Sequence, residues 1–158
     1  MYQLIVNGNI QISETNKKLI DFLREDLDLT SVKNGCKEGA CGTCMVLIDG
    51  RACKACVQEL KNLSGKNILT VEGLSQREKD VYSYAFSVSG AVQCGFCTPG
   101  MILAAEALLS ANPSPSREEI LQGLSGNLCR CTGYTSIVEA VEAAAKEGEG
   151  LWPVPFSP

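Results

Sequence analysis

The sequence has no histidine among its 158 residues and little basic charge, with 14 basic residues, 18 acidic residues and a net charge of −4. Imidazole is the usual general base and the most common metal ligand near neutral pH. Its absence excludes Ser-His-Asp catalysis, Rieske centres, histidine-containing zinc fingers and histidine-ligated haem. The basic residues also form no run dense enough to follow a phosphate backbone, so we expect no nucleic-acid partner.

Long hydrophobic runs are missing as well. No segment approaches the ~20 apolar residues of a membrane span, and residues 1–7 lack the basic and apolar regions of a signal peptide. We therefore expect a cytoplasmic protein with no membrane span. Thiols in that compartment are kept reduced, and the nine cysteines are an odd number and too few for a disulfide scaffold. Clustered cysteines then favour metal or redox chemistry.

The first part of the chain, residues 1–74, predicts a small β-rich domain. Short apolar runs alternate with Asn7-Gly8 and Asp49-Gly50, which favour tight hairpin turns. Thr15 is positioned to cap the helix expected after the first hairpin. Beyond that helix, glycines interrupt every period over residues 28–42. A structureless stretch of that length is more often functional than filler.

The second part, residues 81–147, predicts a helical domain. The starting signals include Thr98 followed by proline, and the capping pair of Ser116 and Glu119. The expected helices cover 81–89, a segment from Thr98 to Asn112, 116–124 and 135–146. We expect a linker over 75–80 and a proline-rich apolar tail over 148–158, whose Trp152 and Phe156 would dock on a partner.

Three cysteines stand in a C-x4-C-x2-C arrangement inside the glycine-rich stretch, and a fourth follows after eleven residues. This is the plant-type ferredoxin spacing for a 2Fe–2S cluster, in which each iron takes two terminal sulfur ligands. Inward-pointing backbone N–H groups would neutralise the anionic cluster, and glycines allow such a backbone. A four-cysteine zinc site, or glycines that serve turns alone, is the alternative. The cysteines are Cys36, Cys41, Cys44 and Cys56, and the glycines are Gly35, Gly39 and Gly42.

Cys53 complicates the choice of the fourth cysteine, because it forms a C-x-x-C pattern with Cys56. Positions three apart on a strand face opposite sides, so only one of the two should face the loop. Geometry alone does not choose between them. Cys53 otherwise fits the role of a small buried hydrophobic residue.

A second cysteine set consists of Cys94 and Cys97, followed after thirty-one residues by Cys129 and Cys131. Each pair lies just ahead of a predicted helix N-terminus. Positive helix ends and unpaired amides favour thiolates and an anionic cluster. A second 2Fe–2S cluster and a four-cysteine zinc site both fit this set.

Three segments carry a resemblance that extends from about residue 2 to residue 146. They read KNGCKEGACGTC over 33–44, GAVQCGFCTPG over 90–100 and SGNLCRCTGY over 125–134. They resemble the small iron–sulfur subunit of the molybdenum hydroxylases, the family of xanthine dehydrogenase, aldehyde oxidoreductase and aerobic carbon monoxide dehydrogenase. Thr43 and Met45 stand where the family more often has alanine and threonine, Cys53 is extra, and the tail matches nothing in the family.

The resemblance implies an α+β fold with an N-terminal β-grasp domain of ferredoxin type and a C-terminal four-helix domain. It also implies which cysteines hold each of two 2Fe–2S clusters. In the first domain these are Cys36, Cys41, Cys44 and Cys56, and in the second they are Cys94, Cys97, Cys129 and Cys131.

The implied function is electron transfer rather than catalysis. Electrons would pass from a molybdenum–pterin centre on a large subunit, through both clusters, to FAD on a medium subunit. The cluster of the helical domain would lie nearer to molybdenum, and Gln93 and Cys131 match positions that approach the partner's molybdopterin. The alternatives are a free ferredoxin-like carrier and a zinc-stabilised interaction module.

Overall fold

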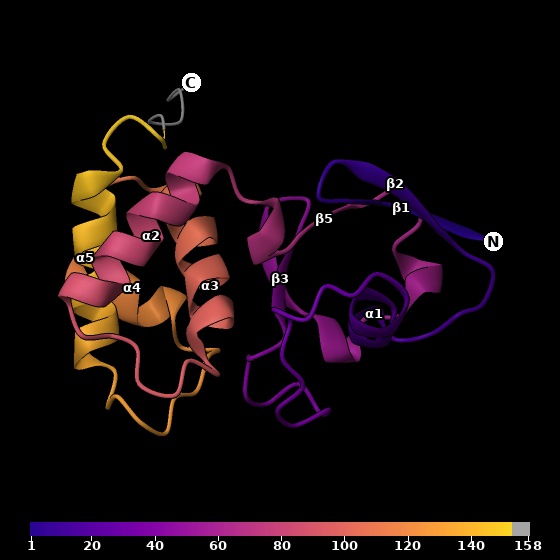
Figure 1. Ribbon diagram of the computed structural model, residues 1–158, viewed down its shortest axis with the longest axis horizontal. Coiled ribbons are helices and arrows are strands. Elements are labelled where there is room, and N and C mark those ends of the chain that lie inside the picture. The colour runs from indigo at the N-terminus through magenta and orange to yellow at the C-terminus, as the bar shows by residue number, and fades with distance from the viewer. Residues whose placement is uncertain (153–158) are drawn as a thin grey trace.

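The computed structural model describes residues 1–152 and places a five-stranded sheet beside a group of helices (Figure 1). The strands are β1 (Tyr2–Val6), β2 (Asn9–Ser13), β3 (Met45–Ile48), β4 (Arg51–Lys54) and β5 (Asn67–Leu69). Their order is β2-β1-β5-β3-β4, with β1 and β5 parallel and the other neighbours antiparallel. A small sheet and several helices in one chain confirm the expected mixed fold.

Both predicted hairpin turns are present, and their backbone explains the residue types. Asn7 and Gly8 have φ values of 49° and 82°, and Asp49 and Gly50 have values of 48° and 81°. Two successive residues with positive φ define the turn that matches the twist of the flanking strands. Asparagine, aspartate and glycine tolerate this conformation better than other residues do.

The helix after the first hairpin starts later than predicted. It comprises α1 (Leu19–Asp21), followed by a π-helical turn over Phe22–Asp26, and its N-cap is Lys18 rather than Thr15. The Leu19 N–H donates to the carbonyl of Gln58 at 2.9 Å. A backbone contact with the segment before β5 therefore sets the start of the helix, and no side-chain cap is used.

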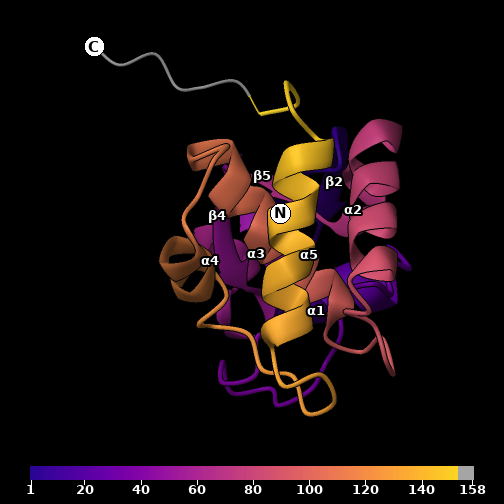
Figure 2. The same cartoon turned by 90° about the vertical axis from the view of Figure 1, so that its left-hand side faces the viewer.

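The second part of the chain forms four helices, which Figure 2 shows from their outer side. They are α2 (Gln76–Val88), α3 (Thr98–Ala111), α4 (Arg117–Gly123) and α5 (Thr135–Glu147). Ser116 and Glu119 form the predicted capping box. The start predicted for α2 was wrong by five residues, because Ser75 and Glu78 form a second capping box that turns most of the expected linker, residues 75–80, into helix.

Strand β3 lies between two hydrophobic cores, and all four of its residues are buried. Val46 and Ile48 pack with α1 and the inner residues of β1, whereas Met45 and Leu47 pack with the helices α2 to α5. Successive side chains of a strand face opposite sides, so a strand that is apolar at every position is covered on both faces. In Figure 1, α3 runs beside β3 on the helical side.

The end of the described chain packs onto its own helices. Trp152 is 5% exposed, and its Nε1 donates to Glu106 Oε1 at 3.1 Å, while the Tyr82 hydroxyl donates to Glu106 Oε2 at 2.6 Å. The expectation that Trp152 docks on a partner was therefore wrong, because a buried carboxylate of the same chain accepts its N–H. Phe156, the second expected anchor, lies outside the described residues.

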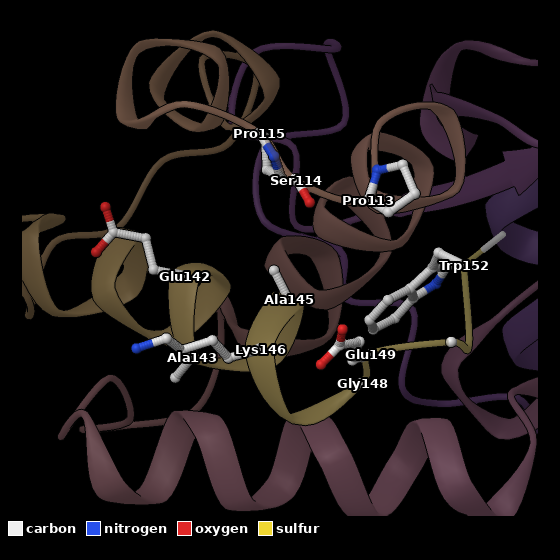
Figure 3. Close-up of a pocket in the computed structure, with 11 residues that line it drawn as sticks. Pro113, Ser114, Pro115, Glu142, Ala143, Ala145, Lys146, Gly148, Glu149 and Trp152 are labelled. Atoms are coloured by element: carbon white, nitrogen blue, oxygen red, sulfur yellow. The ribbon is translucent and has the colours of Figure 1, made fainter. Parts of the chain in front are cut away.

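The indole of Trp152 borders an open groove between the end of α5 and the loop after α3 (Figure 3). Pro113, Glu142 and Lys146 are among the residues that line this groove, and the described part of its lining includes no cysteine. The groove is thus separate from both cysteine sets. Within residues 1–152, none of the helices has the length and apolar character that a membrane span requires.

We predict that Glu106→Gln makes stability less dependent on pH. Burial raises the pKa of Glu106 above its ordinary value of 4.5, and the nearby Glu78 carboxylate adds to this, while hydrogen bonds from Tyr82 and Trp152 oppose it. The folded state therefore holds the proton more tightly, so its contribution is largest below pH 4.5 and is lost as pH rises through the folded pKa.

The free energy of unfolding of the variant should accordingly rise relative to that of the wild type as the pH is raised above 4.5 and through the folded pKa of Glu106. Denaturant titrations at several pH values measure this difference. Glu139→Gln, at an exposed position of α5, is the matched control and should follow the wild type. Parallel pH profiles for wild type and Glu106→Gln would contradict the prediction.

Candidate metal centres

The cysteines of both sets gather at one end of the molecule. The loop before β3, which carries Cys36, Cys41 and Cys44, lies at the same end as the loops that lead into α3 and α5, and the two views agree on this (Figures 1 and 2). The latter two loops carry the four cysteines of the second set. Segments that are far apart in the sequence thus place seven of the eight predicted ligands at one end of the molecule, and the eighth, Cys56, follows β4.

The four thiols of the first set form two pairs. The Cys36 thiol lies beside that of Cys41, and its Sγ accepts the backbone N–H groups of Ala40 at 3.3 Å and Cys41 at 3.4 Å. The thiols of Cys44 and Cys56 lie close enough for Cys56 to raise the pKa of Cys44. Two separate pairs match the requirement of a 2Fe–2S cluster for two thiolates on each iron.

The two pairs differ in their electrostatic surroundings. Hydrogen bonds from the backbone of Cys41, Glu38 and Ala40 lower the pKa of Cys36 to about 6. Burial raises the pKa of Cys44 to about 11. The first pair therefore lies on the side of the loop that already stabilises a thiolate, and the second lies against the core of the sheet.

Cys53 and Cys56 are separated by a change of backbone structure rather than by strand alternation. β4 ends at Lys54, and Cys56 lies in a 3-10 turn over Ala55–Val57. The Ala55 N–H donates to the Cys44 carbonyl at 3.1 Å, which brings the turn against the end of the cysteine loop. Cys53 stays in β4, partly buried against the sheet core, and burial raises its pKa.

The three glycines of the loop serve two different purposes. Gly39 and Gly42 have φ values of 78° and 74°, as the expected inward-turning backbone requires. Gly35 does not have a positive φ and is required for space instead. A Cβ there would lie 2.8 Å from Thr43 Oγ1 and 2.9 Å from Cys41 Sγ.

Two residues of this site were not predicted from the sequence. The Thr43 hydroxyl lies 3.1 Å from Cys41 Sγ and 3.2 Å from the Lys33 carbonyl, within hydrogen-bonding distance of both. Lys54 donates from Nζ to the Gly39 carbonyl at 2.8 Å, which places a cation beside the loop. For Thr43, the departure from the family pattern was the one feature of the sequence that could have drawn attention to it. For Lys54, the sequence offered no such feature.

The second set also forms two pairs. The Sγ atoms of Cys94 and Cys131 lie 3.7 Å apart, and the thiol of Cys129 lies close enough to Cys97 to raise the pKa of Cys97. Cys97 is the N-cap of α3, so the predicted location at a helix start is confirmed, one residue ahead of the expected Thr98 cap. The four residues come together across the thirty-one positions that separate them in sequence.

The four cysteines of the second set differ in how deeply they are buried. Cys94 and Cys131 are exposed, whereas Cys97 is buried and Cys129 is half-buried. Burial raises the pKa of Cys97 to about 12. It acts in the same direction on Cys129, but hydrogen bonds from the Thr132 hydroxyl and backbone outweigh it and lower that pKa to about 7.

Exposed apolar and polar side chains both neighbour the exposed pair in sequence, and Gln93 and Arg130 are among the polar ones. Val92, Phe96 and Leu128 neighbour the exposed cysteines in sequence and are 46%, 44% and 53% exposed. Gln93, which precedes Cys94, is exposed as well. Both residues expected to face a partner's molybdopterin, Gln93 and Cys131, are therefore accessible from outside the chain.

The pairing of the thiols bears on the choice between zinc and iron–sulfur clusters. Over the part of the chain that the structure describes, no three or more His, Cys, Asp or Glu side chains are gathered closely enough to hold one metal ion. A structural zinc ion needs four ligands around one point. The two thiol pairs at each site instead fit two irons that share bridging sulfides, with one pair on each iron.

The two cysteine loops touch each other directly. The Leu128 N–H donates to the Cys41 carbonyl at 2.8 Å, and the buried Asn127 side chain donates from Nδ2 to the Gly42 carbonyl at 3.1 Å. A Cβ on Gly42 would overlap the Gly126 carbonyl oxygen. We call these contacts of residues 41–43 with residues 126–128 the loop seam.

Comparisons with known proteins agree with this geometry. Residues 9–83 match the family model of a 2Fe-2S iron-sulfur cluster binding domain, and residues 70–142 match that of a [2Fe-2S] binding domain. The small FeS subunit of nicotinate dehydrogenase from Eubacterium barkeri is 48% identical over 146 residues, which cover 90% of this chain and 93% of that subunit.

Solved structures show the same likeness. A chain of quinoline 2-oxidoreductase from Pseudomonas putida 86 has a TM-score of 0.85 and 42% identity, with 94% of this chain and 96% of that chain covered. The aldehyde oxidoreductase from Desulfovibrio gigas has a TM-score of 0.87 and 40% identity, with 97% of this chain but only 18% of that longer chain covered. The chain therefore belongs to the family of iron–sulfur subunits of the molybdenum hydroxylases and is an electron-transfer subunit of such an oxidoreductase.

Proposed function

We propose that the eight paired cysteines hold two 2Fe–2S clusters and that the chain conducts electrons between them. The observation that carries this proposal is the arrangement of each set as two thiol pairs. When bound, each cluster takes up and releases one electron at a time. The proposed ligands are Cys36, Cys41, Cys44 and Cys56 for the first cluster and Cys94, Cys97, Cys129 and Cys131 for the second.

The residues around the first set would bind and stabilise an anionic group. Backbone N–H groups of Ala40 and Cys41 point at Cys36 Sγ, and the Lys54 ammonium lies against the same loop. Charge-assisted hydrogen bonds of this kind favour thiolates over thiols. The order of the strands, with a helix on one face, supports the further proposal that residues 1–74 form a β-grasp domain of ferredoxin type.

The packing of the helices around their own core supports residues 81–147 as the second, four-helix domain. The nine free thiols fit a reducing compartment, and we propose the cytoplasm as the location.

We also propose two partner subunits, a large one that binds molybdopterin and a medium one that binds FAD. The exposed pair of Cys94 and Cys131 among apolar side chains suits a surface that another protein covers. Gln93 and Cys131 are proposed to face the pterin. Electrons would then enter at the second set and leave from the first. A free carrier in solution would leave these apolar side chains in water.

We predict four iron atoms and four acid-labile sulfides per chain, because eight thiolates supply two clusters. Electron paramagnetic resonance of the reduced protein should resolve two different signals, since one cluster lies in a glycine-rich loop and the other next to a helix N-terminus. Two irons with a single signal would leave only one set as a cluster site. One zinc ion without sulfide would contradict the proposal altogether.

We predict that Cys56→Ser removes the signal of the first cluster and halves the iron content, while the second signal persists. The reason is that the Cys56 thiol lies close to that of Cys44, whereas Cys53 stays in β4. Cys53→Ser is the matched control and should keep both signals and all four irons. Loss of the first signal in Cys53→Ser alone would reassign the fourth ligand.

A further inference from the structure

A hydroxyl group lies against one sulfur of the first cysteine set. Oγ1 of Thr43 is 3.1 Å from Sγ of Cys41 and 3.2 Å from the Lys33 carbonyl oxygen. Thr43 is 6% exposed, so little water competes for its hydroxyl. The proposed function uses the sulfur of Cys41 but gives this neighbouring hydroxyl no role.

The surrounding backbone holds Thr43 in this position. The Lys33 N–H donates to the Thr43 carbonyl at 3.2 Å, which ties the two residues together. Gly35 leaves room for the contact, because a Cβ there would lie 2.8 Å from Thr43 Oγ1 and 2.9 Å from Cys41 Sγ. The hydroxyl and the sulfur therefore pack against the same glycine, which keeps them close to each other.

The hydroxyl has one hydrogen and two acceptors within reach, and the state of Cys41 decides between them. While Cys41 is a thiol, its S–H can donate to Oγ1 of Thr43, and the hydroxyl can donate to the Lys33 carbonyl. A sulfur bound to iron carries no proton, so only the hydroxyl can then supply a hydrogen between Oγ1 and Sγ. An anionic sulfur attracts this hydrogen more strongly than a neutral carbonyl does. The hydroxyl therefore donates to Cys41 Sγ when the first set holds a cluster.

We propose that the Thr43 hydroxyl raises the reduction potential of the first cluster by donating a hydrogen bond to Cys41 Sγ. This inference rests on the proposed assignment of Cys41 to that cluster. Reduction adds one electron to the cluster, and the added negative charge makes its sulfurs better acceptors. The hydrogen bond therefore stabilises the reduced form more than the oxidised form, and the potential rises. No covalent bond forms or breaks, and the hydroxyl keeps its proton.

A similar contact in the second set indicates what the hydroxyl contributes to electron transfer. The Thr132 hydroxyl donates to Cys129 Sγ at 3.2 Å. A donor at one site alone would stabilise the extra electron at that site only. With Thr43 present, a threonine hydroxyl lies on one sulfur of each site, and the two contributions offset each other. Without Thr43, an electron shared between the clusters would favour the second, and its passage to the first would become less favourable.

Lys54 also stabilises negative charge near the first set, but by a different interaction. Its Nζ donates to the Gly39 carbonyl at 2.8 Å, so it acts through its charge rather than through contact with a sulfur. Lys54 is partly exposed, and salt screens the effect of such a charge. A hydrogen bond from the buried Thr43 hydroxyl depends much less on salt. Reduction potentials at two salt concentrations therefore separate the two contributions.

Variants of Thr43 test the proposal in the full chain with both clusters assembled. Thr43→Val removes the hydroxyl and keeps a side chain of similar size, Thr43→Ala removes both, and Thr43→Ser keeps the hydroxyl. Each protein is reduced stepwise with dithionite in the presence of redox mediators. Electron paramagnetic resonance measures how much of each cluster is reduced at each potential, and the second cluster serves as the reference within the same molecule.

We expect Thr43→Val and Thr43→Ala to lower the potential of the first cluster and to leave that of the second unchanged. The equilibrium of one electron between the clusters should shift about tenfold toward the second, which corresponds to about 59 mV. The shift should be the same at low and at high salt, and Thr43→Ser should keep the wild-type potentials. Unchanged potentials in Thr43→Val and Thr43→Ala would overturn the proposal. An equal shift in Thr43→Ser would assign the effect to packing and would overturn it too.

The hydroxyl proton itself provides a second measurement. After exchange into heavy water, electron–nuclear double resonance of the reduced first cluster should detect a deuteron from Thr43. It adds to those from the backbone N–H groups of Ala40 and Cys41, which point at Cys36 Sγ. The coupling should be absent in Thr43→Val and present in Thr43→Ser. Identical couplings in the wild type and Thr43→Val would show that the hydroxyl stays on the Lys33 carbonyl, against the proposal.

Iron and sulfide analysis before the titrations separates failure of this proposal from failure of the proposed function. A wild-type chain that binds fewer than two clusters would overturn the proposed function, and the role of Thr43 would fall with it. Two intact clusters whose potentials do not respond to loss of the hydroxyl would overturn the role of Thr43 alone. If Thr43→Val fails to bind the first cluster, the comparison of Thr43→Ala with Thr43→Ser decides the question.

Discussion

The close approach of two backbones at Gly42 is the constraint on which the arrangement of the cysteines depends. A Cβ on Gly42 would overlap the Gly126 carbonyl oxygen, and a Cβ on Gly100 would lie 2.6 Å from the Gly42 carbonyl oxygen. An L-residue at Gly42 would suffer a steric overlap in addition to the strain of a φ of 74°. The two backbones therefore come close enough for the Leu128 N–H to reach the Cys41 carbonyl and for the Asn127 side chain to reach the Gly42 carbonyl, and the spacing between the two sets follows from this contact.

Strand β3 explains why the contact can be rigid. Its alternating side chains enter two different cores, with Val46 in the core of the sheet and Leu47 in that of the helices. The strand follows Cys44 directly, and α3 begins at Thr98, directly after Cys97. Packing of α3 against β3 thus fixes the elements that carry both cysteine sets. Electron transfer falls off steeply with separation, so a shared strand suits this function better than a flexible linker would.

Local signals in the sequence were read correctly where one short motif determines one short structure. Asn7-Gly8 and the pair of Ser116 and Glu119 are of this kind. The capping box of Ser75 and Glu78 carried the same signal, but the polar composition of the segment suggested a linker instead. The contact of Asn127 with Gly42 could not be predicted, because it joins residues 85 positions apart. Neither an asparagine nor a glycine indicates by its type that it makes such a long-range contact. Trp152 was misassigned because its acceptor, a buried glutamate in α3, has no signature in the sequence.

The exposure of the thiol pairs indicates the direction in which electrons would pass through the chain. Cys94 and Cys131 are exposed among apolar side chains, whereas Cys97 is buried beside Cys129, whose neighbour Leu128 donates across the loop seam. On the proposed assignment, the outer pair meets the partner that supplies electrons and the inner pair faces the seam. A protein that exchanged electrons with many carriers would gain from exposing both sites equally. The asymmetry of the second set instead suits a chain that receives electrons at one fixed interface and passes them inward.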